Sequence, residues 1–432
     1  MKSKLATFIF LQVVFFFGFD YFSIFAIAVI LLNKIFKKNY FMNYNSNFFK
    51  LVTSIFYFGK LLFATNINFL KYWKSTSYSL VSIDYPFIDM HAFLFKVKCN
   101  ALNENFMYDP LYRTETNWVP GVECENYILP YGPIENLISF NFQNIWSSTL
   151  VVVFIFTTIL IKIYFDLIDA TTEKYKYIIF FLSLSPAVNF LIDRANLDLI
   201  IYICIYYIFK NYQNYMVLKL LLLLFFSLLK LHPIFIIFGL LIYFVITKEY
   251  KIASLHFLVL LIFTVFFGNW YFNNSFLTPL PSYPGLTFGI LSDAILLNRL
   301  LNINQVVLYL FITIFVMLFV KINYKNVESF NKMNYSTFSI LFWFCCVSVY
   351  ANNDYRLVLL LFIFNFVCST KNQVYELSYF LLFLLNPLPL ILNMPNEIQM
   401  LKAGVYIDIN FYFFFAFTIV LLIKQITTLY KN

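Results

Sequence analysis

The chain has 432 residues, of which 62% are hydrophobic and 12% are charged, and its formal net charge is +9. That charged fraction is about half the usual value for a soluble domain, so the composition excludes a soluble globular protein. The positive charge does not call for a nucleic-acid partner, because Lys and Arg usually mark the cytoplasmic loops of membrane proteins. The composition therefore predicts a helical protein embedded in a lipid bilayer.

Apolar runs recur from one end of the chain to the other. A membrane-crossing helix needs roughly 20 apolar residues, and a shorter helix is acceptable where it faces protein or a water-filled cavity. The sequence thus predicts one integral membrane domain over residues 1–432, an all-α polytopic transmembrane bundle of about 11–13 spans. The predicted spans are 5–32, 50–72, 146–163, 177–192, 197–210, 217–230, 233–247, 252–270, 303–321, 336–350, 356–370, 377–393 and 409–424.

The loops between these spans differ in charge. One set is short and rich in Lys, as cytoplasmic loops are; it comprises 33–50, 162–176, 210–219, 248–251, 321–332, 371–376 and the C-terminal tail. Residues 73–145 then form a long external loop. Cys99 and Cys124 share this loop and could form a disulfide if it faces an oxidising compartment. No cysteine spacing suggests a metal, and we expect neither a metal nor a cofactor.

Charged and polar residues gather at the predicted external ends of the spans. They come from the long loop, from two turns between spans and from the start of a late span. Because all four groups fall on one side of the membrane, we expect them to line a shared external cavity. The groups are Asp84, Asp89 and His91; Arg194, Asn196 and Asp198; Lys230 and His232; and Asp354, Tyr355 and Arg356.

Less specific interpretations remain open for each group. Arg194 and Asp198 are four residues apart and could form a local ion pair on one helix face. Lys230 could extend its charge to the membrane interface, and His232 could cap a helix end. Intramembrane ionisable residues are nevertheless functional candidates by default.

Three cations on one face suit an anionic head group such as phosphate or pyrophosphate. Arg194 and Arg356 offer planar forks for phosphate oxygens, and Lys230 offers a point charge. A carboxylate in the long loop, Asp89 or Asp84, could deprotonate an acceptor hydroxyl as a general base. Such a base beside a phosphate site is what a transferase with a lipid-phosphate donor requires. We expect the site to be lined by His91, Tyr131, Asn196, Asp198, His232 and Tyr355.

Several segments resemble the multi-spanning glycosyltransferases of the GT-C superfamily, particularly the polyprenyl-phosphate-sugar-dependent, mannosyltransferase-like group. "FIDMHAFLFKVKCNALNENFMYDP" is similar to their first external loop, and "ENYILPYGPIENLI" to their Tyr-Pro-Pro segment. "LSPAVNFLIDRANLDLIIYI" resembles their Ser-Pro…Arg-Gly-Asn-x-Asp element, with Ala195 in place of the Gly. "LLKLHPIFII" and "ANNDYRLVLLL" resemble their Lys-x-x-Pro and late Tyr-Arg elements.

The resemblance implies a GT-C-like fold and an inverting, metal-independent sugar transfer. Asp89 would be the base, with Asp84 in reserve, and Arg194, Lys230 and Arg356 would contact the donor phosphate. The implied partners are a polyprenyl-phosphate-linked sugar donor and a glycan or glycolipid acceptor. The lack of a eukaryotic retention signal or soluble modules favours a bacterial inner membrane over the endoplasmic reticulum, and we expect the active site to face the periplasm or exterior.

Two other functions remain open. An O-antigen or capsule polymerase is also polytopic and binds a similar lipid, although its large external loop usually lies later in the chain. A transporter or flippase would more often show inverted repeats with paired broken helices, which the sequence does not display.

Overall fold

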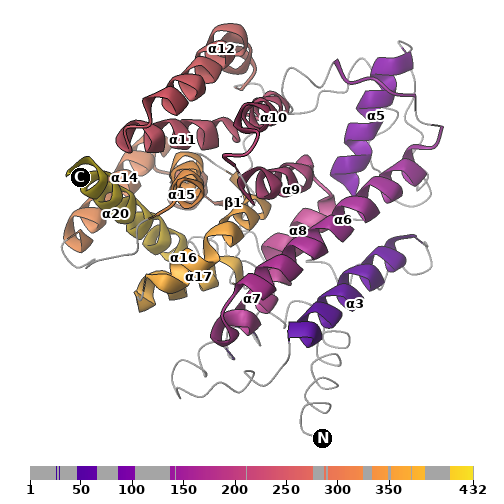
Figure 1. Cartoon of the computed structure of the whole chain (residues 1–432), viewed down its shortest axis with the longest axis horizontal. Coiled ribbons are helices and arrows are strands. Elements are labelled where there is room, and N and C mark those ends of the chain that lie inside the picture. Colours follow the sequence, from indigo (N-terminus) through magenta and orange to yellow (C-terminus); the bar gives the residue numbers. More distant parts are fainter. Residues whose placement is uncertain are drawn as a thin grey trace, which may run out of the picture.

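The computed structural model describes residues 26, 29, 46–65, 86–102, 137–141, 143–210, 212–275, 287–288, 290–324, 333–348, 352–370, 372–384 and 409–431. This part of the chain is helical apart from turns and one short antiparallel pairing, in which Thr287 lies opposite Asn353. The elements, with the labels of Figure 1, are α3 (Ser46–Thr65), α5 (Ile88–Leu102), α6 (Ile145–Ala170), η4 (Glu173–Tyr175), α7 (Lys176–Ser183), α8 (Pro186–Arg194), α9 (Leu197–Lys210), α10 (Met216–Leu229), α11 (Ile234–Ile246), α12 (Tyr250–Ser275), β1 (Thr287–Phe288), α13 (Ile290–Leu301), α14 (Gln305–Asn323), α15 (Tyr335–Ser348), β2 (Asn352–Asn353), η5 (Asp354–Ile363), α16 (Phe364–Ser369), α17 (Gln373–Leu384) and α20 (Ile409–Lys431).

Five of the described helices are long and apolar enough to cross a membrane, namely α3, α6, α12, α14 and α20. A sixth span results if α7 and α8 are counted together. The chain is therefore a helical protein of the multi-pass membrane type, as the composition predicts. The other apolar helices are shorter than a bilayer requires, so the predicted 11–13 spans exceed the described helices that qualify by length.

Two helices lie where the sequence predicts loops. Helix α5 occupies part of the predicted external loop 73–145, and α13 lies between the predicted spans 252–270 and 303–321. Both carry charged or polar residues at intervals, which lowers their hydropathy below that of a span. Most of the loop 73–145 and of the predicted span 5–32 lies outside the described residues.

Helices α7 and α8 form a broken rod, in which Glu173–Ser183 and Ala187–Arg194 meet at an angle of 49°. The break follows from Pro186, which lacks a backbone N–H and favours the first position of a new helix. The side-chain amide of Asn189 donates to the carbonyls of Leu184 (3.0 Å) and Ser185 (3.2 Å). The backbone groups exposed by the break are thus satisfied inside the protein, as a membrane environment requires.

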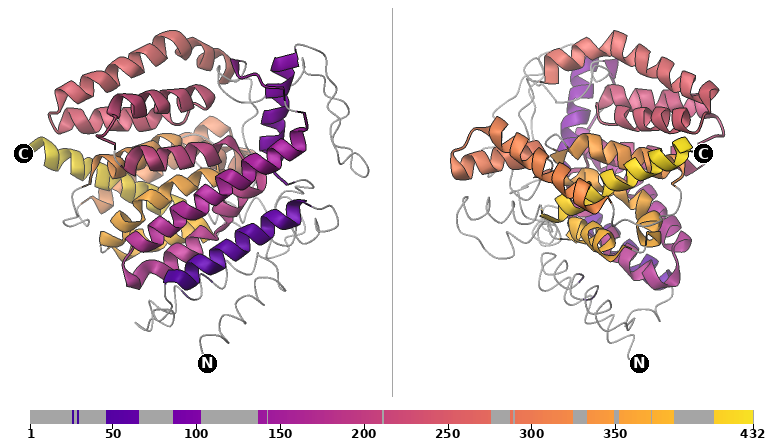
Figure 2. Two further views of the ribbon diagram at one scale, coloured as in Figure 1. Left: turned by 45° about the vertical axis from the view of Figure 1, so that its right-hand side comes forward. Right: turned by 90° about the vertical axis from the view of Figure 1, so that its left-hand side faces the viewer.

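Packing draws the helices into layers. Helix α3 lies along α6, and α11 lies between α12 and α15 (Figure 2). A Cβ atom at Gly239 of α11 would come within 2.9 Å of the Ser339 backbone in α15. Glycine therefore permits the close approach of these two helices, a common device between membrane helices.

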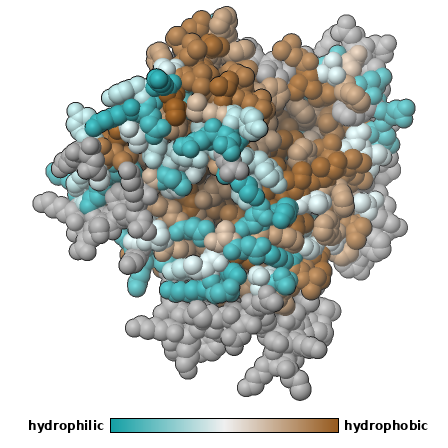
Figure 3. Space-filling view, in the orientation of Figure 1, coloured by the Kyte–Doolittle hydropathy of each residue, from teal (hydrophilic) through white to brown (hydrophobic). Residues whose placement is uncertain are grey.

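Large apolar side chains cover the outside of the bundle as well as its core. Figure 3 shows them gathered over α12 at the top of the view, and exposed apolar residues also follow α14, among them Leu310, Phe311 and Ile314. Extended apolar surfaces of this kind are unfavourable in water and are suited to lipid. The described helices therefore present a surface that fits a bilayer.

Candidate functional site

The turn between α8 and α9 separates two of the predicted site residues. Ala195 adopts a left-handed backbone with φ of 45°, which ends α8 at Arg194. The Asn196 side chain then accepts a hydrogen bond from the backbone N–H of Asp198 (3.1 Å), as a residue at a helix start often does. Arg194 and Asp198 therefore belong to different helices and do not lie one turn apart on a single helix face.

Helix α5 is fixed to this turn through its backbone. Phe87, just before α5, donates its N–H to the carbonyl of Asp193 at 2.7 Å. Asp89 lies in the first turn of α5, where the helix dipole favours a negative charge. The backbone contact brings this carboxylate beside the end of α8.

Asp89 is held on two sides. Arg194 donates to both of its oxygens, with Nε to Oδ2 at 2.9 Å and Nη2 to Oδ1. Asn196 donates from its amide to Oδ2 at 2.6 Å. Such two-point binding of a carboxylate is strong and fixes its orientation. The side chains of Arg194 and Asp89 remain 29% and 13% exposed, so this end of the site is open.

Lys230 connects this carboxylate to a second one. Its ammonium donates to Asn196 Oδ1 and to Asp198 Oδ2, the latter at 2.8 Å. Asn196 therefore bridges Lys230 and Asp89 through the two ends of its amide. Lys230 and Asp198 are both buried, and a buried charge needs such a partner.

Two further groups face Asp198. Arg356 at the start of η5 places Nε 3.6 Å from Oδ2, and His232 places Nε2 3.4 Å from Oδ1. Both distances are long for hydrogen bonds, so Arg356 acts on Asp198 mainly through its charge. Burial lowers the pKa of His232, in the turn between α10 and α11, to about 3, and its ring is therefore neutral at pH 7.

These residues form one contiguous group, which we call the polar network; its members are Asp89, Arg194, Asn196, Asp198, Lys230, His232 and Arg356. Helix ends from four separate parts of the chain contribute to it. Among these described residues, three cationic side chains lie with two carboxylates. The two arginines are its more exposed cations and are placed where an anion could reach them.

The remaining predicted site residues do not belong to the polar network as the structure describes it. The described contacts of His91 are with α6: Nδ1 lies 3.2 Å from the Thr149 hydroxyl, and the ring packs edge-on against Trp146. Burial lowers the pKa of His91 to about 4. Asp84 and Tyr131 lie outside the described residues. For Asp354 and Tyr355 the structure describes the backbone at the start of η5 but not the side chains.

A second polar group lies beside the network and was not assigned a role from sequence. Lys60 of α3 forms an ion pair with Asp193 and donates to Asn189 Oδ1 at 3.1 Å. Both charged side chains are completely buried. The available signal was Lys60 itself, a charge in the interior of an apolar helix, but the sequence did not indicate which carboxylate would reach it.

The cysteine prediction is partly tested. Cys99 takes part in a disulfide, whereas Cys204, Cys345, Cys346 and Cys368 are free. Cys124, the predicted partner of Cys99, lies outside the described residues.

Comparisons of the chain with protein family models, curated proteins and solved structures find no match. The chemistry of the site therefore rests on its own residues. A carboxylate fixed at the open end of a cation-rich cluster, among apolar helices, can accept a proton next to a bound anion.

Proposed function

We propose that the chain is a membrane glycosyltransferase that moves a sugar from a polyprenyl-phosphate donor to a glycan or glycolipid acceptor. The proposal is supported by the placement of Asp89 directly against Arg194, in a group whose described members also include Lys230 and Arg356. A proton acceptor and a phosphate-binding cation must lie side by side in such a reaction. The surrounding apolar helices would hold the lipid part of the donor in the bilayer.

In the proposed reaction, the acceptor hydroxyl oxygen attacks the anomeric carbon and its proton passes to Asp89. The bond between that carbon and the donor phosphate oxygen breaks, and the lipid phosphate leaves with the electron pair. Its negative charge would be stabilised by the guanidinium groups of Arg194 and Arg356, the more exposed cations of the network. Direct inversion at the anomeric carbon needs no covalent enzyme intermediate.

Arg194 links the two halves of this mechanism. In the structure its Nε and Nη2 atoms engage both oxygens of Asp89. A donor phosphate would compete for the same guanidinium, and its arrival would make a carboxylate oxygen available for the acceptor proton. The base would thus become active when the donor is present.

The buried position of Lys230 changes its proposed part. Its ammonium is only 7% exposed and already contacts Asp198 and Asn196. We therefore assign it to positioning Asn196 and thereby Asp89, in place of the direct phosphate contact implied by the family resemblance. Its charge still adds to the field that favours an anion.

The test is a transfer assay with the purified protein in lipid nanodiscs. Labelled polyprenyl-phosphate hexoses would be the donors, and a membrane extract would supply acceptors. Asp89→Asn should lower transfer by at least about a thousandfold while the donor still binds, because the substitution removes the base. Asp169→Asn, which removes an exposed carboxylate paired with Lys50, is the matched control and should retain activity.

The outcomes separate the candidate functions. Transfer that survives Asp89→Asn would remove Asp89 as the base, and folded protein that transfers no hexose from any donor would contradict the proposal. In cells that lack the protein, a truncated lipid-linked glycan supports a transferase. A single complete repeat unit supports a polymerase.

A transporter remains the second candidate because of one observation. The broken rod α7–α8 carries a buried ion pair, Lys60–Asp193, at its end, and broken helices with buried charges are typical of transporter substrate sites. Uptake of a lipid-linked or free sugar into proteoliposomes, abolished by Asp193→Asn, would favour this function over transfer.

A further inference from the structure

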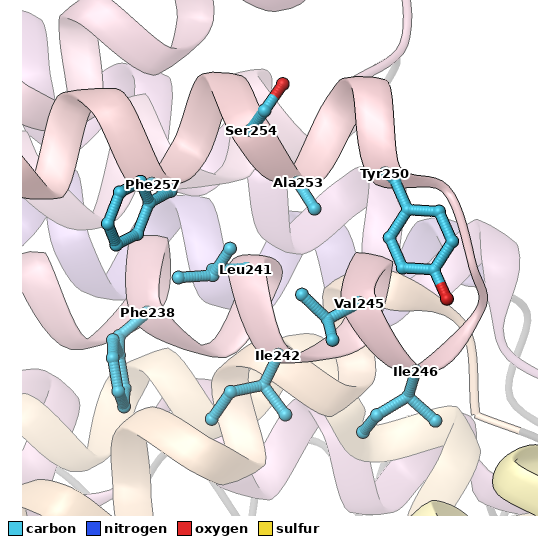
Figure 4. Close-up of a pocket in the computed structure, with 9 residues that line it drawn as sticks. All are labelled: Phe238, Leu241, Ile242, Val245, Ile246, Tyr250, Ala253, Ser254 and Phe257. Carbon is cyan, nitrogen blue, oxygen red and sulfur yellow. The ribbon is translucent and has the colours of Figure 1, made fainter.

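An apolar groove of about 430 Å³ lies between α11 and the first half of α12 (Figure 4). Its lining residues come from both helices, and the surface that they present to it is apolar. Several of them, including Phe238, Val245 and Phe257, are exposed on the outside of the bundle. The full lining is Phe238, Leu241, Ile242, Val245, Ile246, Tyr250, Ala253, Ser254 and Phe257.

The position of the groove restricts what can fill it. Helix α12 is one of the membrane-spanning candidates, so its exposed face meets hydrocarbon and not water. The groove is much larger than the ~30 Å³ that a water molecule occupies. Although Tyr250 and Ser254 are among the lining residues, the surface that faces the groove is apolar and offers no binding groups to water or a sugar. A lipid chain is therefore the chemically matched occupant.

One end of the groove carries positive charge. The turn that joins α11 to α12 places Lys248 in a left-handed conformation with φ of 63°, and Lys248 and Lys251 are both exposed. Within the part of the chain that the structure describes, neither lysine has a carboxylate partner. Tyr250 lies at the same end of the groove, as Figure 4 shows. The N-terminus of α12 lies at this end too, and the partial positive charge of the helix dipole adds to that of the lysines.

The charge at this end is not uniform. Glu249 lies between the two lysines, and its carboxylate accepts a hydrogen bond from the Thr247 hydroxyl at 3.2 Å. Two lysines and a helix N-terminus therefore oppose one carboxylate. The net positive charge at this end of the groove favours a ligand whose anionic group lies here and whose apolar chain lies in the groove.

We propose that this groove binds an acyl chain of an anionic phospholipid from the bilayer, with the head-group phosphate at Lys248 and Lys251. The site is separate from the polar network, because α11 spans about 20 Å between His232 and Thr247. The proposal does not depend on the sugar-transfer function. Basic residues at the ends of grooves between membrane helices are suited to such head groups.

Native mass spectrometry of the full chain from detergent micelles provides the test. The micelles would contain phosphatidylglycerol or phosphatidylcholine with identical acyl chains. The wild-type protein should retain phosphatidylglycerol preferentially, and Lys248→Gln combined with Lys251→Gln should lower that preference by roughly tenfold. Val245→Trp, which fills the groove, should reduce the retention of both lipids.

A matched control keeps the test specific. Val306→Trp adds the same bulk to an exposed apolar position on α14 and should leave lipid retention unchanged. Circular dichroism would establish that each variant is folded. Equal lipid retention by Val245→Trp and wild type would overturn the groove assignment, and an unchanged phosphatidylglycerol preference without the lysines would overturn the head-group site. If polyprenyl phosphate at equal concentration displaces phosphatidylglycerol, the groove binds polyprenyl phosphate in preference, and the proposal of an anionic phospholipid is wrong.

Discussion

Two ion pairs on adjacent residues of α8 show how differently one stretch of chain can use charge. Asp193 pairs with Lys60 where both side chains are completely buried, whereas Arg194 pairs with Asp89 where both remain partly exposed. The first pair joins α3 to the broken rod α7–α8. The second opens to the outside and is surrounded by further cations.

The two pairs differ in exposure and in their neighbours. Lys60 and Asp193 balance each other's charge, and neither side chain is exposed in this structure. The polar network has more cations than carboxylates, and its most exposed members are the two arginines and Asp89. Exposure and the gathering of several cations, and not the presence of an ion pair, therefore distinguish the polar network as the candidate site.

The largest effect is expected at the buried pair. Lys60→Met or Asp193→Leu alone should lower the free energy of unfolding by about 3–5 kcal/mol, because each leaves a buried charge without its counter-ion. The double variant should lose much less than either single variant. Thermal unfolding in detergent, monitored by size-exclusion chromatography, measures the stability of the two single variants and of the double variant. Equal losses for the double variant and the worse single variant would contradict a simple charge pair.

A smaller effect is expected from pH. Burial lowers the pKa of His91 to about 4 and that of His232 to about 3, from an ordinary value near 6.5. The unfolded chain therefore takes up these protons first, and stability present above pH 6.5 is lost as the pH falls toward 4.

His91→Phe isolates the contribution of His91 to this pH dependence, which amounts to about 3 kcal/mol at pH 4. Thr149 keeps a partner in this variant, because its hydroxyl also donates to the Ile145 carbonyl at 2.8 Å. Unfolding temperatures from pH 7.5 to 4.5 should fall less steeply for His91→Phe than for wild type. Parallel curves would show that His91 does not titrate as its burial indicates.

The smallest effect concerns the turn that separates the two regions. Ala195→Gly should change stability by less than about 1 kcal/mol, because relief of the left-handed backbone offsets the loss of one buried methyl group. Ala187→Gly, at a buried position inside α8, should cost at least about 1 kcal/mol. Equal destabilisation by the two substitutions in thermal unfolding would remove the argument for strain at Ala195.

Hydropathy predicts the helices well and their interruptions poorly. The spans around α6, α12 and α14 follow from long apolar runs. The residues at the ends of predicted spans also meet, as the contacts of Asp198 with Lys230 and Arg356 show. The assignment of these span ends to one side of the membrane was enough to predict that they meet, because helix ends on one face of a bundle lie close together.

The pairings themselves could not be predicted from the sequence. Lys60 and Asp193 are far apart in the chain, and their contact depends on how α3 packs against the broken rod. Arg194 and Asp198 suggested a one-helix pair, and only the left-handed Ala195 separates them. Hydropathy does not distinguish helix α5 from the rest of the external loop, because polar residues such as Asp89 and Asn100 interrupt its apolar pattern.

A direct binding measurement tests whether the polar network binds a lipid phosphate. Fluorescent polyprenyl phosphate without a sugar would be titrated into the protein in nanodiscs, with Lys50→Ala as a control for the loss of one partly exposed cation that pairs with Asp169. Arg194→Ala should weaken binding by at least about tenfold, since charge-assisted contacts to phosphate are strong, while Lys50→Ala should bind as wild type does. Equal affinity of wild type and Arg194→Ala, in protein shown to be folded, would contradict the claim.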